Sequence, residues 1–379
     1  MNFNLKTTVL DSFKALGIRD NFIKGLTELK IVTPSEIQKE VIPILLNGPT
    51  DLIGQAQTGT GKTAAFGLPL LHSIDASKNE IQGLILCPTR ELGQQVAKQL
   101  FKFTKYTEKI FTEAVYGGAQ IENQIRALQR PTHIVVATPG RLIDLVRRKA
   151  IDIRKVHTVI LDEADEMLSM GFKKELEAIL EALPNAKQKW LFSATMPEGI
   201  KDIVNKHMAP DAIRIETSPT NVVNRNISHQ FVVCDESEKL NVLLSFLKSQ
   251  GKNRGLVFCK TKAATQKLAK QLIAKNIPTD GLHGDLLQKE RDKVMRAFKN
   301  ENLRFIVATD IAARGIDVKD LAYVVHYQLP DKEEYYTHRS GRTARAGKDG
   351  ISISLVTTNE KKQIRYFAQA LNIDFSQVK

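Results

Sequence analysis

The segment Val156-His-Thr-Val-Ile-Leu-Asp-Glu-Ala-Asp165 decides how the rest of this chain is interpreted. An apolar run, residues 159–161, leads directly into the carboxylates Asp162 and Glu163. In nucleotide hydrolases, an Asp at the end of a buried strand holds Mg²⁺ and a Glu orients the attacking water. Asp and Glu are also favoured in the first turn of a helix. The segment alone fits both interpretations, so the choice depends on other parts of the chain.

A second segment, Ala56-Gln-Thr-Gly-Thr-Gly-Lys-Thr63, predicts a phosphate-binding loop. It follows an apolar run and precedes residues 63–68, which are compatible with a helix. Glycines let backbone N–H groups approach phosphates closely, a lysine reaches the β- and γ-phosphates, and a threonine hydroxyl can ligate Mg²⁺. The strict pattern has Gly where Ala56 stands, so the match is imperfect there. With Asp162 and Glu163, the loop favours a nucleotide site built from Gln57, Thr58, Gly59, Thr60, Gly61, Lys62 and Thr63, in which Thr63 and Asp162 ligate the metal.

Apolar runs alternate with amphipathic stretches along the whole chain. This alternation predicts an α/β fold with doubly wound parallel sheets. Most of the runs end in polar or glycine-rich segments, and ligands bind at the carboxyl ends of strands in such sheets. Residues after Val356 are expected to form at most one charged helix and a short tail. The expected strands are 51–54, 84–87, 134–137, 159–161, 190–192, 255–259, 305–308, 323–327 and 351–356.

The alternation pauses once, at Ser-Pro-Thr-Asn-Val-Val-Asn-Arg-Asn, residues 218–226. This stretch has no helical period and is rich in Asn, Ser and Pro, which is typical of a linker. We therefore expect an N-terminal domain over residues 1–217, a linker over 218–226 and a C-terminal domain over 227–379.

The composition is that of a basic globular protein. Lys and Arg number 55 against 42 for Asp and Glu, which gives a net charge of +13 and suits a polyanionic partner. No apolar run is long enough to span a membrane, and the first residues lack a signal-peptide pattern. Cys87, Cys234 and Cys259 have no metal-binding spacing, and we expect buried thiols in a cytoplasmic protein.

In combination, these motifs resemble the core of the DEAD-box RNA helicases, named for residues 162–165. The resemblance extends from about Phe13 to Val356 and implies two tandem RecA-like domains, ATP and Mg²⁺ as cofactors, and RNA as the partner of a monomeric enzyme. The motifs occur in the family's order: Phe13 with 34–38, 58–63, 88–92, Gly117-Gly118, 138–141, 162–165, 193–195, 257–261, Gln288 with Arg291, 308–317 and 338–347.

The resemblance also implies roles for single residues. Phe13 and Gln38 belong to the adenine-reading segment, and the Gln38 amide can donate to and accept from the base edge. Asp317 is implied to contact the ribose, while Arg342 and Arg345 act as arginine fingers on the γ-phosphate. Such fingers are worth about 10³–10⁵ in rate. The residues implied to couple hydrolysis to domain movement are Asp165, Ser193, Thr195, His338 and Arg339, of which Arg339 would tie the two domains together.

The implied RNA-binding residues are small, hydroxylated or basic. Glycine allows close approach, threonine offers a hydroxyl and arginine a charged fork, so these residues suit phosphates and sugars. Aromatic residues make up only 6% of the chain, which disfavours a base-stacking platform. Binding is therefore expected to be independent of sequence and sensitive to salt. The residues are Thr89, Arg90, Gly118, Thr138, Gly140, Arg141, Arg291 and Thr309.

Four positions depart from the usual pattern of the family. Lys30 and Ile31 stand where Gly and an aromatic residue are usual, and Ile31 cannot stack on adenine as a ring would. Ser340 replaces a commoner aliphatic residue and Ala344 a commoner Gly. Two alternatives to an unwinding enzyme are considered. An ATP-gated RNA clamp remains open, whereas the adenine-reading and DEAD segments argue against a DNA helicase.

Overall fold

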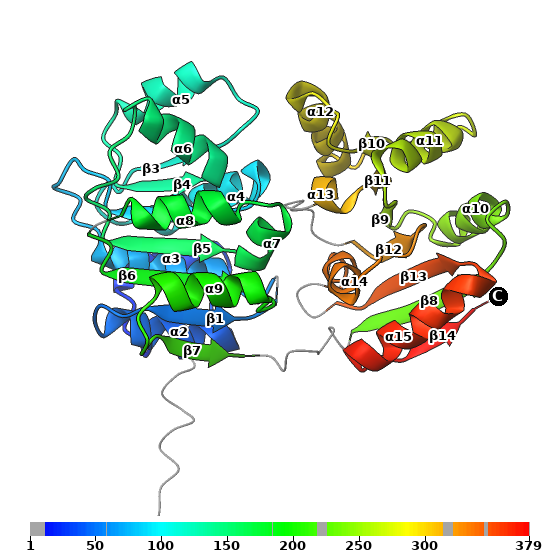
Figure 1. Ribbon diagram of the computed structural model, residues 1–379, viewed down its shortest axis with the longest axis horizontal. Coiled ribbons are helices and arrows are strands. Elements are labelled where there is room, and N and C mark those ends of the chain that lie inside the picture. Colours follow the sequence, from blue (N-terminus) through cyan, green and yellow to red (C-terminus); the bar gives the residue numbers. More distant parts are fainter. Residues whose placement is uncertain are drawn as a thin grey trace, which may run out of the picture. The chain divides into compact units, whose positions relative to one another are not determined.

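The computed structural model describes residues 12–57, 59–183, 185–217, 226–313, 321–344 and 348–378. The chain divides into two compact units, unit 1 (Met1–Ser218) and unit 2 (Pro219–Lys379). Each unit contains a sheet of seven strands, and all of the strand pairs are parallel (Figure 1). The predicted fold class is therefore confirmed.

The sheet of unit 1 has the strand order β3-β4-β2-β5-β6-β1-β7. Its strands are β1 Leu52–Gln55, β2 Gly83–Leu86, β3 Thr112–Val115, β4 Ile134–Ala137, β5 Thr158–Asp162, β6 Gln188–Ser193 and β7 Ile213–Glu216. The helices are α1 Asp20–Glu28, α2 Glu36–Leu46, α3 Lys62–Ser73, α4 Arg90–Phe103, α5 Ile121–Leu128, α6 Pro139–Arg147, α7 Ala164–Ser169, α8 Lys173–Glu181 and α9 Glu198–His207.

Helices cover both faces of this sheet, so the central strands are apolar on both sides. Ile160 of β5 packs with side chains of α2, α3 and α4 in one core, and its neighbours Val159 and Leu161 pack with α6, α7, α8 and α9 in the other. Figure 1 shows α2 and α3 behind the sheet and α8 and α9 in front of it. Because both faces of the sheet are covered, polar ligand-binding residues are found at the carboxyl ends of the strands.

Unit 2 repeats the topology of unit 1. Its order, β10-β11-β9-β12-β13-β8-β14, is the same as that of unit 1 when its strands are counted from its own first strand. The strands are β8 Ile227–Val233, β9 Gly255–Phe258, β10 Gly281–Leu282, β11 Phe305–Ala308, β12 Tyr323–His326, β13 Gly350–Val356 and β14 Phe375–Gln377. The helices are α10 Lys239–Ser249, α11 Lys262–Ile273, α12 Gln288–Lys299, α13 Asp310–Ala313, α14 Glu333–Ser340 and α15 Lys361–Leu371, with a 3₁₀ turn, η2, at Thr358–Glu360.

The same capping residue starts the equivalent helices of the two units. Thr89 accepts a hydrogen bond from the Leu92 N–H at the start of α4, and Thr261 accepts one from the Ala264 N–H at the start of α11. Threonine is a favoured N-cap because its oxygen satisfies a helix N–H that has no intrahelical partner. These caps fix where each helix leaves its strand.

The expectation for the C-terminal segment was incomplete. After α15 the chain adds β14, which pairs with β8 and extends the second sheet. Ser376 and Gln377 are exposed, so this edge strand lacks the apolar run on which the prediction depended. No helix in the described parts of the chain is long and apolar enough to cross a membrane.

Candidate functional site

The strand order of unit 1 divides the predicted residues into two groups along one edge of the sheet. The ends of β1, β6 and β5 are neighbours and carry the phosphate loop, Ser193 and Asp162. The ends of β2, β4 and β3 lie on the other side of β5 and carry Thr89, Thr138 and Gly118. The nucleotide and RNA candidates are therefore adjacent on a single sheet, with Asp162 and Glu163 at the boundary.

The phosphate loop has the backbone conformation that its glycines predict. Gly59 and Gly61 have φ angles of 86° and 95°, in the left-handed region that side chains disfavour. Lys62 begins helix α3, is largely buried, and donates from Nζ to the Ala56 carbonyl at 2.8 Å. The Thr60 hydroxyl donates to the Gln57 carbonyl at 2.8 Å. Thr58 lies outside the described residues.

Gln38 joins the adenine-reading segment to this loop. Its Nε2 donates to the Gly61 carbonyl at 2.9 Å, and its Oε1 accepts from the Ser35 N–H at 3.0 Å in the capping box of α2. A Cβ at Gly61 would overlap the Gln38 amide, so glycine is required by close approach as well as by φ. A movement of the Gln38 amide would therefore displace the phosphate loop at Gly61.

Phe13 does not lie as the resemblance implied. It is 2% exposed and packs in the core that lies between the sheet and α1–α4. A ring buried in this way cannot stack on a nucleotide, so direct adenine contact by Phe13 is wrong. Phe13 instead stabilises the segment that leads into α1.

Asp162 and Glu163 are both buried at the end of β5. Burial raises the pKa of Asp162 to about 7, and the positive charge of Lys62 opposes that shift. Asp162 Oδ1 is buried and has no hydrogen-bond partner among the described residues. Glu163 has a φ of 52°, a strained conformation for a residue with a side chain, of a kind that is often found at functional sites.

These observations fit a bound Mg²⁺. A divalent cation would satisfy the unpartnered Asp162 oxygen and remove the cost of its buried charge. Mg²⁺ is commonly held by one or two carboxylates together with substrate phosphates. No cluster of three or more His, Cys, Asp or Glu side chains suited to a metal occurs within the described ranges. Thr63, in the first turn of α3, supplies a hydroxyl on the same loop.

Asp165 connects the ends of β5 and β6. Its Oδ2 accepts from both the Thr195 N–H and the Thr195 hydroxyl at 2.8 Å. The Ser193 hydroxyl accepts from the Asp165 N–H at 3.2 Å and donates to the Thr195 carbonyl at 2.7 Å. Hydrogen bonds therefore join Ser193 and Thr195 to Asp165, which stands two residues after Glu163 in the sequence.

The RNA candidates of unit 1 surround the ends of β2, β4 and β3. Gly118 has a φ of 77°, and the Thr138 hydroxyl accepts from the Gly117 N–H at 3.4 Å. A Cβ at Gly140 would meet no atom of the described residues within 4 Å. Packing therefore does not require glycine at this position, and the absence of a side chain leaves room for a ligand.

Sequence reasoning missed two residues here, Tyr116 and Gln124. Gln124 bonds to Arg141, and the Tyr116 ring lies under Arg90. A signal for Gln124 was available, because it stands three residues after Ile121 and four before Leu128, in the apolar stripe of its helix. Tyr116 gave no comparable signal, since its contacts depend on the tertiary structure.

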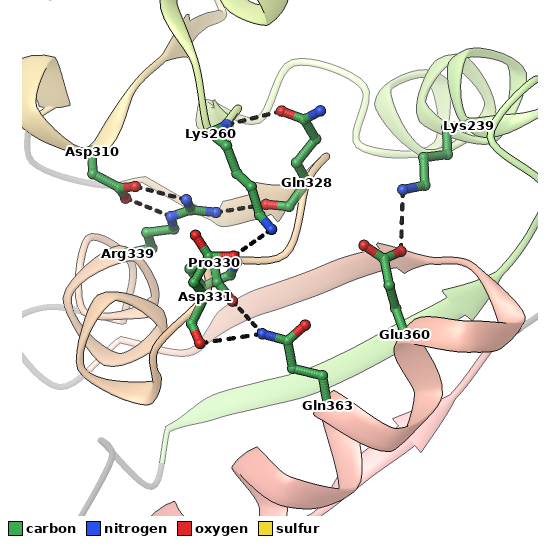
Figure 2. Close-up of polar contacts among 9 residues, drawn as sticks. All are labelled: Lys239, Lys260, Asp310, Gln328, Pro330, Asp331, Arg339, Glu360 and Gln363. Carbon is green, nitrogen blue, oxygen red and sulfur yellow. Dashed lines mark hydrogen bonds and ion pairs between the residues drawn. The ribbon is translucent and has the colours of Figure 1, made fainter.

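In unit 2, the buried Arg339 side chain is held by residues of its own unit. The Arg339 guanidinium donates to both Asp310 carboxylate oxygens, at 2.6 and 2.7 Å, and to the Gln328 carbonyl at 2.8 Å (Figure 2). Its side chain is 1% exposed and lies over the Phe258 ring. Through these bonds Arg339 connects α13, which follows Thr309, to α14, the helix that precedes Arg342.

Two other predicted residues of unit 2, Arg291 and Thr309, bond to Ala312 of α13. Arg291 of α12 donates to the Ala312 carbonyl at 2.8 Å, and the Thr309 hydroxyl accepts from the Ala312 N–H at 3.4 Å. His338 lies in the last turn of α14, and Arg342 is largely buried just after it. Asp317 and Arg345 lie outside the described residues.

Comparison with known proteins identifies the family. Residues 35–203 match the DEAD/DEAH box helicase family, and residues 238–347 match the helicase conserved C-terminal domain. The DEAD-box ATP-dependent RNA helicase CshA of Bacillus cereus (strain ATCC 10987 / NRS 248) is 42% identical over 357 residues, which are 94% of this chain and 67% of the relative. The chain belongs to the DEAD-box ATP-dependent RNA helicases.

Solved structures agree with this assignment. S. cerevisiae Dbp5 bound to RNA and ADP BeF3 is 31% identical, with a TM-score of 0.89 over 97% of this chain and 95% of that one. Mss116p bound to ssRNA and AMP-PNP is 27% identical, with a TM-score of 0.88 over 100% of this chain and 81% of that one. The predicted tandem RecA-like fold of this DEAD-box helicase is thus confirmed, and so is the predicted class of enzyme.

Proposed function

We propose that this DEAD-box helicase is an RNA-stimulated ATPase that separates short RNA duplexes by closing its two RecA-like domains over ATP and RNA. The observation that carries the proposal is the strand order of unit 1, in which the nucleotide and RNA candidates flank β5 on one sheet edge. RNA bound beside β2, β4 and β3 is then close enough to influence Glu163. RNA-bound relatives such as Dbp5 and Mss116p support the choice of ligand.

In the proposed reaction, Glu163 accepts a proton from the attacking water. Lys62 stabilises the β- and γ-phosphates, and Arg342 with Arg345 stabilises the charge that develops at the γ-phosphate. Thr63 and Asp162 would hold Mg²⁺, which when bound neutralises phosphate charge. Asp317 is proposed to bind the ribose, and Gln38 to select adenine and transmit its presence to the loop through Gly61.

Coupling to RNA is proposed to use the two hydrogen-bonded connections. In unit 1, Asp165 links the end of β5 to Ser193 and Thr195. In unit 2, Arg339 links Asp310 to the segment that carries His338 and Arg342. Closure would bring Arg342 to the phosphate site while one RNA strand is held by its backbone and the other is displaced. Hydrolysis would reopen the domains.

The remaining RNA contacts are proposed to be made to phosphates and sugars. Thr89, Arg90, Gly118, Thr138, Gly140, Arg141, Arg291 and Thr309 fit this kind of contact, since none belongs to an obvious base-reading set. Selection of RNA over DNA would act through the 2′-OH. A cytoplasmic location is also proposed, because Cys87, Cys234 and Cys259 are buried and free, as in a reducing compartment.

The experiment is ATP turnover measured with single-stranded RNA, single-stranded DNA of the same sequence, and no nucleic acid. We expect strong stimulation by RNA and little by DNA. Equal stimulation by both would contradict the proposal. Multiple-turnover unwinding of a short duplex would favour the helicase, whereas long-lived ATP-bound complexes without strand release would favour an RNA clamp.

A further inference from the structure

A buried glutamine lies at the centre of the RNA candidates of unit 1. Gln124, in α5, is 6% exposed, and residues on either side of it in the same helical stripe, Ile121 and Leu128, pack against the apolar core. An amide placed there loses hydration, which is costly unless its donors and acceptors are satisfied inside the protein. The hydrogen-bond partners of the Gln124 amide therefore indicate its structural role.

Gln124 connects the loop after β3 to the start of α6. Its Oε1 accepts from the Tyr116 N–H at 3.3 Å and from Arg141 Nη1 at 2.8 Å, while its Nε2 donates to the Tyr116 carbonyl at 3.1 Å. A second bond, from Arg141 Nη2 to the Ala119 carbonyl at 3.0 Å, completes the hold on the guanidinium. Figure 1 shows α5 and α6 together at the β3–β4 edge of the sheet.

The Tyr116 side chain supports the second arginine. The guanidinium carbon of Arg90 lies 4.6 Å from the centre of the Tyr116 ring, which is within the range of a cation–π interaction. Gln94 Nε2 donates to the Tyr116 hydroxyl at 2.6 Å. The tyrosine is thus fixed at its backbone by Gln124 and at its hydroxyl by Gln94, and the ring between them gives Arg90 a defined surface.

We propose that Gln124 and Tyr116 are positioning residues that orient Arg141 and Arg90 for the RNA backbone. The inference rests on the proposed function, in which both arginines bind RNA. An arginine that is already oriented loses less conformational entropy when it binds a phosphate, so the affinity is higher. Neither Gln124 nor Tyr116 contacts the phosphate loop through the bonds described above. Their loss is therefore expected to weaken RNA binding and to leave RNA-independent ATP hydrolysis unchanged.

The test uses Gln124→Leu, which keeps the approximate volume and removes the three hydrogen bonds. The RNA concentration that gives half-maximal ATPase stimulation should rise about tenfold, with turnover at saturating RNA and the KM for ATP within twofold of the original. The dependence of log affinity on log salt should become shallower by about 0.7, as expected when one phosphate contact to a single strand is lost. Gln129→Leu, an exposed glutamine at the end of the same helix, is the matched control and should change neither quantity.

A double-mutant cycle with Arg141→Ala separates this inference from the proposed function. Arg141→Ala alone should weaken RNA binding, and adding Gln124→Leu should weaken it further by less than tenfold, because the effect of Gln124 that acts through Arg141 is already lost. If Arg141→Ala has no effect, the RNA role of Arg141 is wrong and the inference falls with it. If Arg141→Ala weakens binding while Gln124→Leu leaves affinity and salt dependence unchanged, only the positioning role is overturned.

Tyr116 provides a second test that does not depend on how well Gln124→Leu folds. Tyr116→Phe keeps the ring under Arg90 and should keep RNA affinity within about threefold. Tyr116→Leu removes the ring and should raise the half-stimulating RNA concentration severalfold. Equal affinities of the two variants would show that the ring does not orient Arg90.

Discussion

Removal of Arg339 should destabilise unit 2 more than most single substitutions. Its partner Asp310 retains 23% side-chain exposure, so an unpaired Asp310 carboxylate keeps some hydration. Removing one partner of a buried ion pair costs about 3–5 kcal/mol of stability. Because Asp310 keeps some hydration, we expect Arg339→Met to lower the unfolding free energy of unit 2 by about 3 kcal/mol. With a urea m-value of about 2 kcal/mol/M, the unfolding midpoint of unit 2 should fall by about 1.5 M.

The single tryptophan of the chain makes the assay specific. Trp190 lies in β6 and is buried in unit 1, so its fluorescence reports that unit alone, while far-UV circular dichroism reports both. Arg339→Met should shift the dichroism transition and leave the Trp190 transition in place. The double variant Arg339→Met/Asp310→Leu also removes the unpaired Asp310 carboxylate, and it should recover at least about 1 kcal/mol of the lost stability of unit 2. A single variant within about 1 kcal/mol of the original, or a double variant less stable than the single one, would refute the account of this pair.

Three further predictions concern two departures from the family pattern, Ile31 and Lys30, and one buried histidine, His229. Ile31 is partly buried against the core between the sheet and α1–α4, and it cannot stack on a base as a ring would. Ile31→Phe should therefore bind ATP modestly more tightly by calorimetry, and equal or weaker binding would refute this expectation. Lys30 follows α1 at a φ of 59°, where glycine is usual, so Lys30→Gly should stabilise unit 1 by up to about 1 kcal/mol in the Trp190 assay, and a loss of stability would contradict this. Burial lowers the pKa of His229 to about 4, whereas the unfolded chain takes up this proton near pH 6.5. His229 should therefore not affect the stability of unit 2 above about pH 6.5, and should make unit 2 less stable as the pH falls toward 4. The dependence of unfolding free energy on pH should be shallower in His229→Phe, and an unchanged dependence would argue against this.

The central strands could be predicted from the sequence because they are buried on both faces. Residues 134–137 and 305–308 are short apolar runs, and both form strands with the expected bounds. The edge strands β3 and β7 were missed because Thr112, Glu113, Arg214 and Glu216 break the apolar pattern. An edge strand is held by backbone bonds to one neighbour, which its side chains do not reveal.

The chemical core of the site was predictable for a different reason. The phosphate loop and the DEAD segment are each one continuous stretch of sequence, so the groups within each segment are close together without help from distant residues. Contacts between distant residues were not accessible in this way. The Arg339–Asp310 pair spans 29 positions and the Gln124–Arg141 bond spans 17, and in each case the partner is chosen by the folded structure. The burial of Phe13 was missed for the same reason.

The measurement that tests the central claim most directly is ATP turnover by Glu163→Gln at saturating RNA. The variant keeps the size and hydrogen-bonding reach of the side chain but cannot accept the proton of the attacking water. We expect ATP binding within a few-fold of the original and turnover reduced by at least about 10²-fold, the lower end of what a general base contributes. Glu166→Gln, a buried glutamate on the same helical turn, should retain near-normal turnover. Near-normal hydrolysis by Glu163→Gln would contradict the role assigned to the DEAD segment.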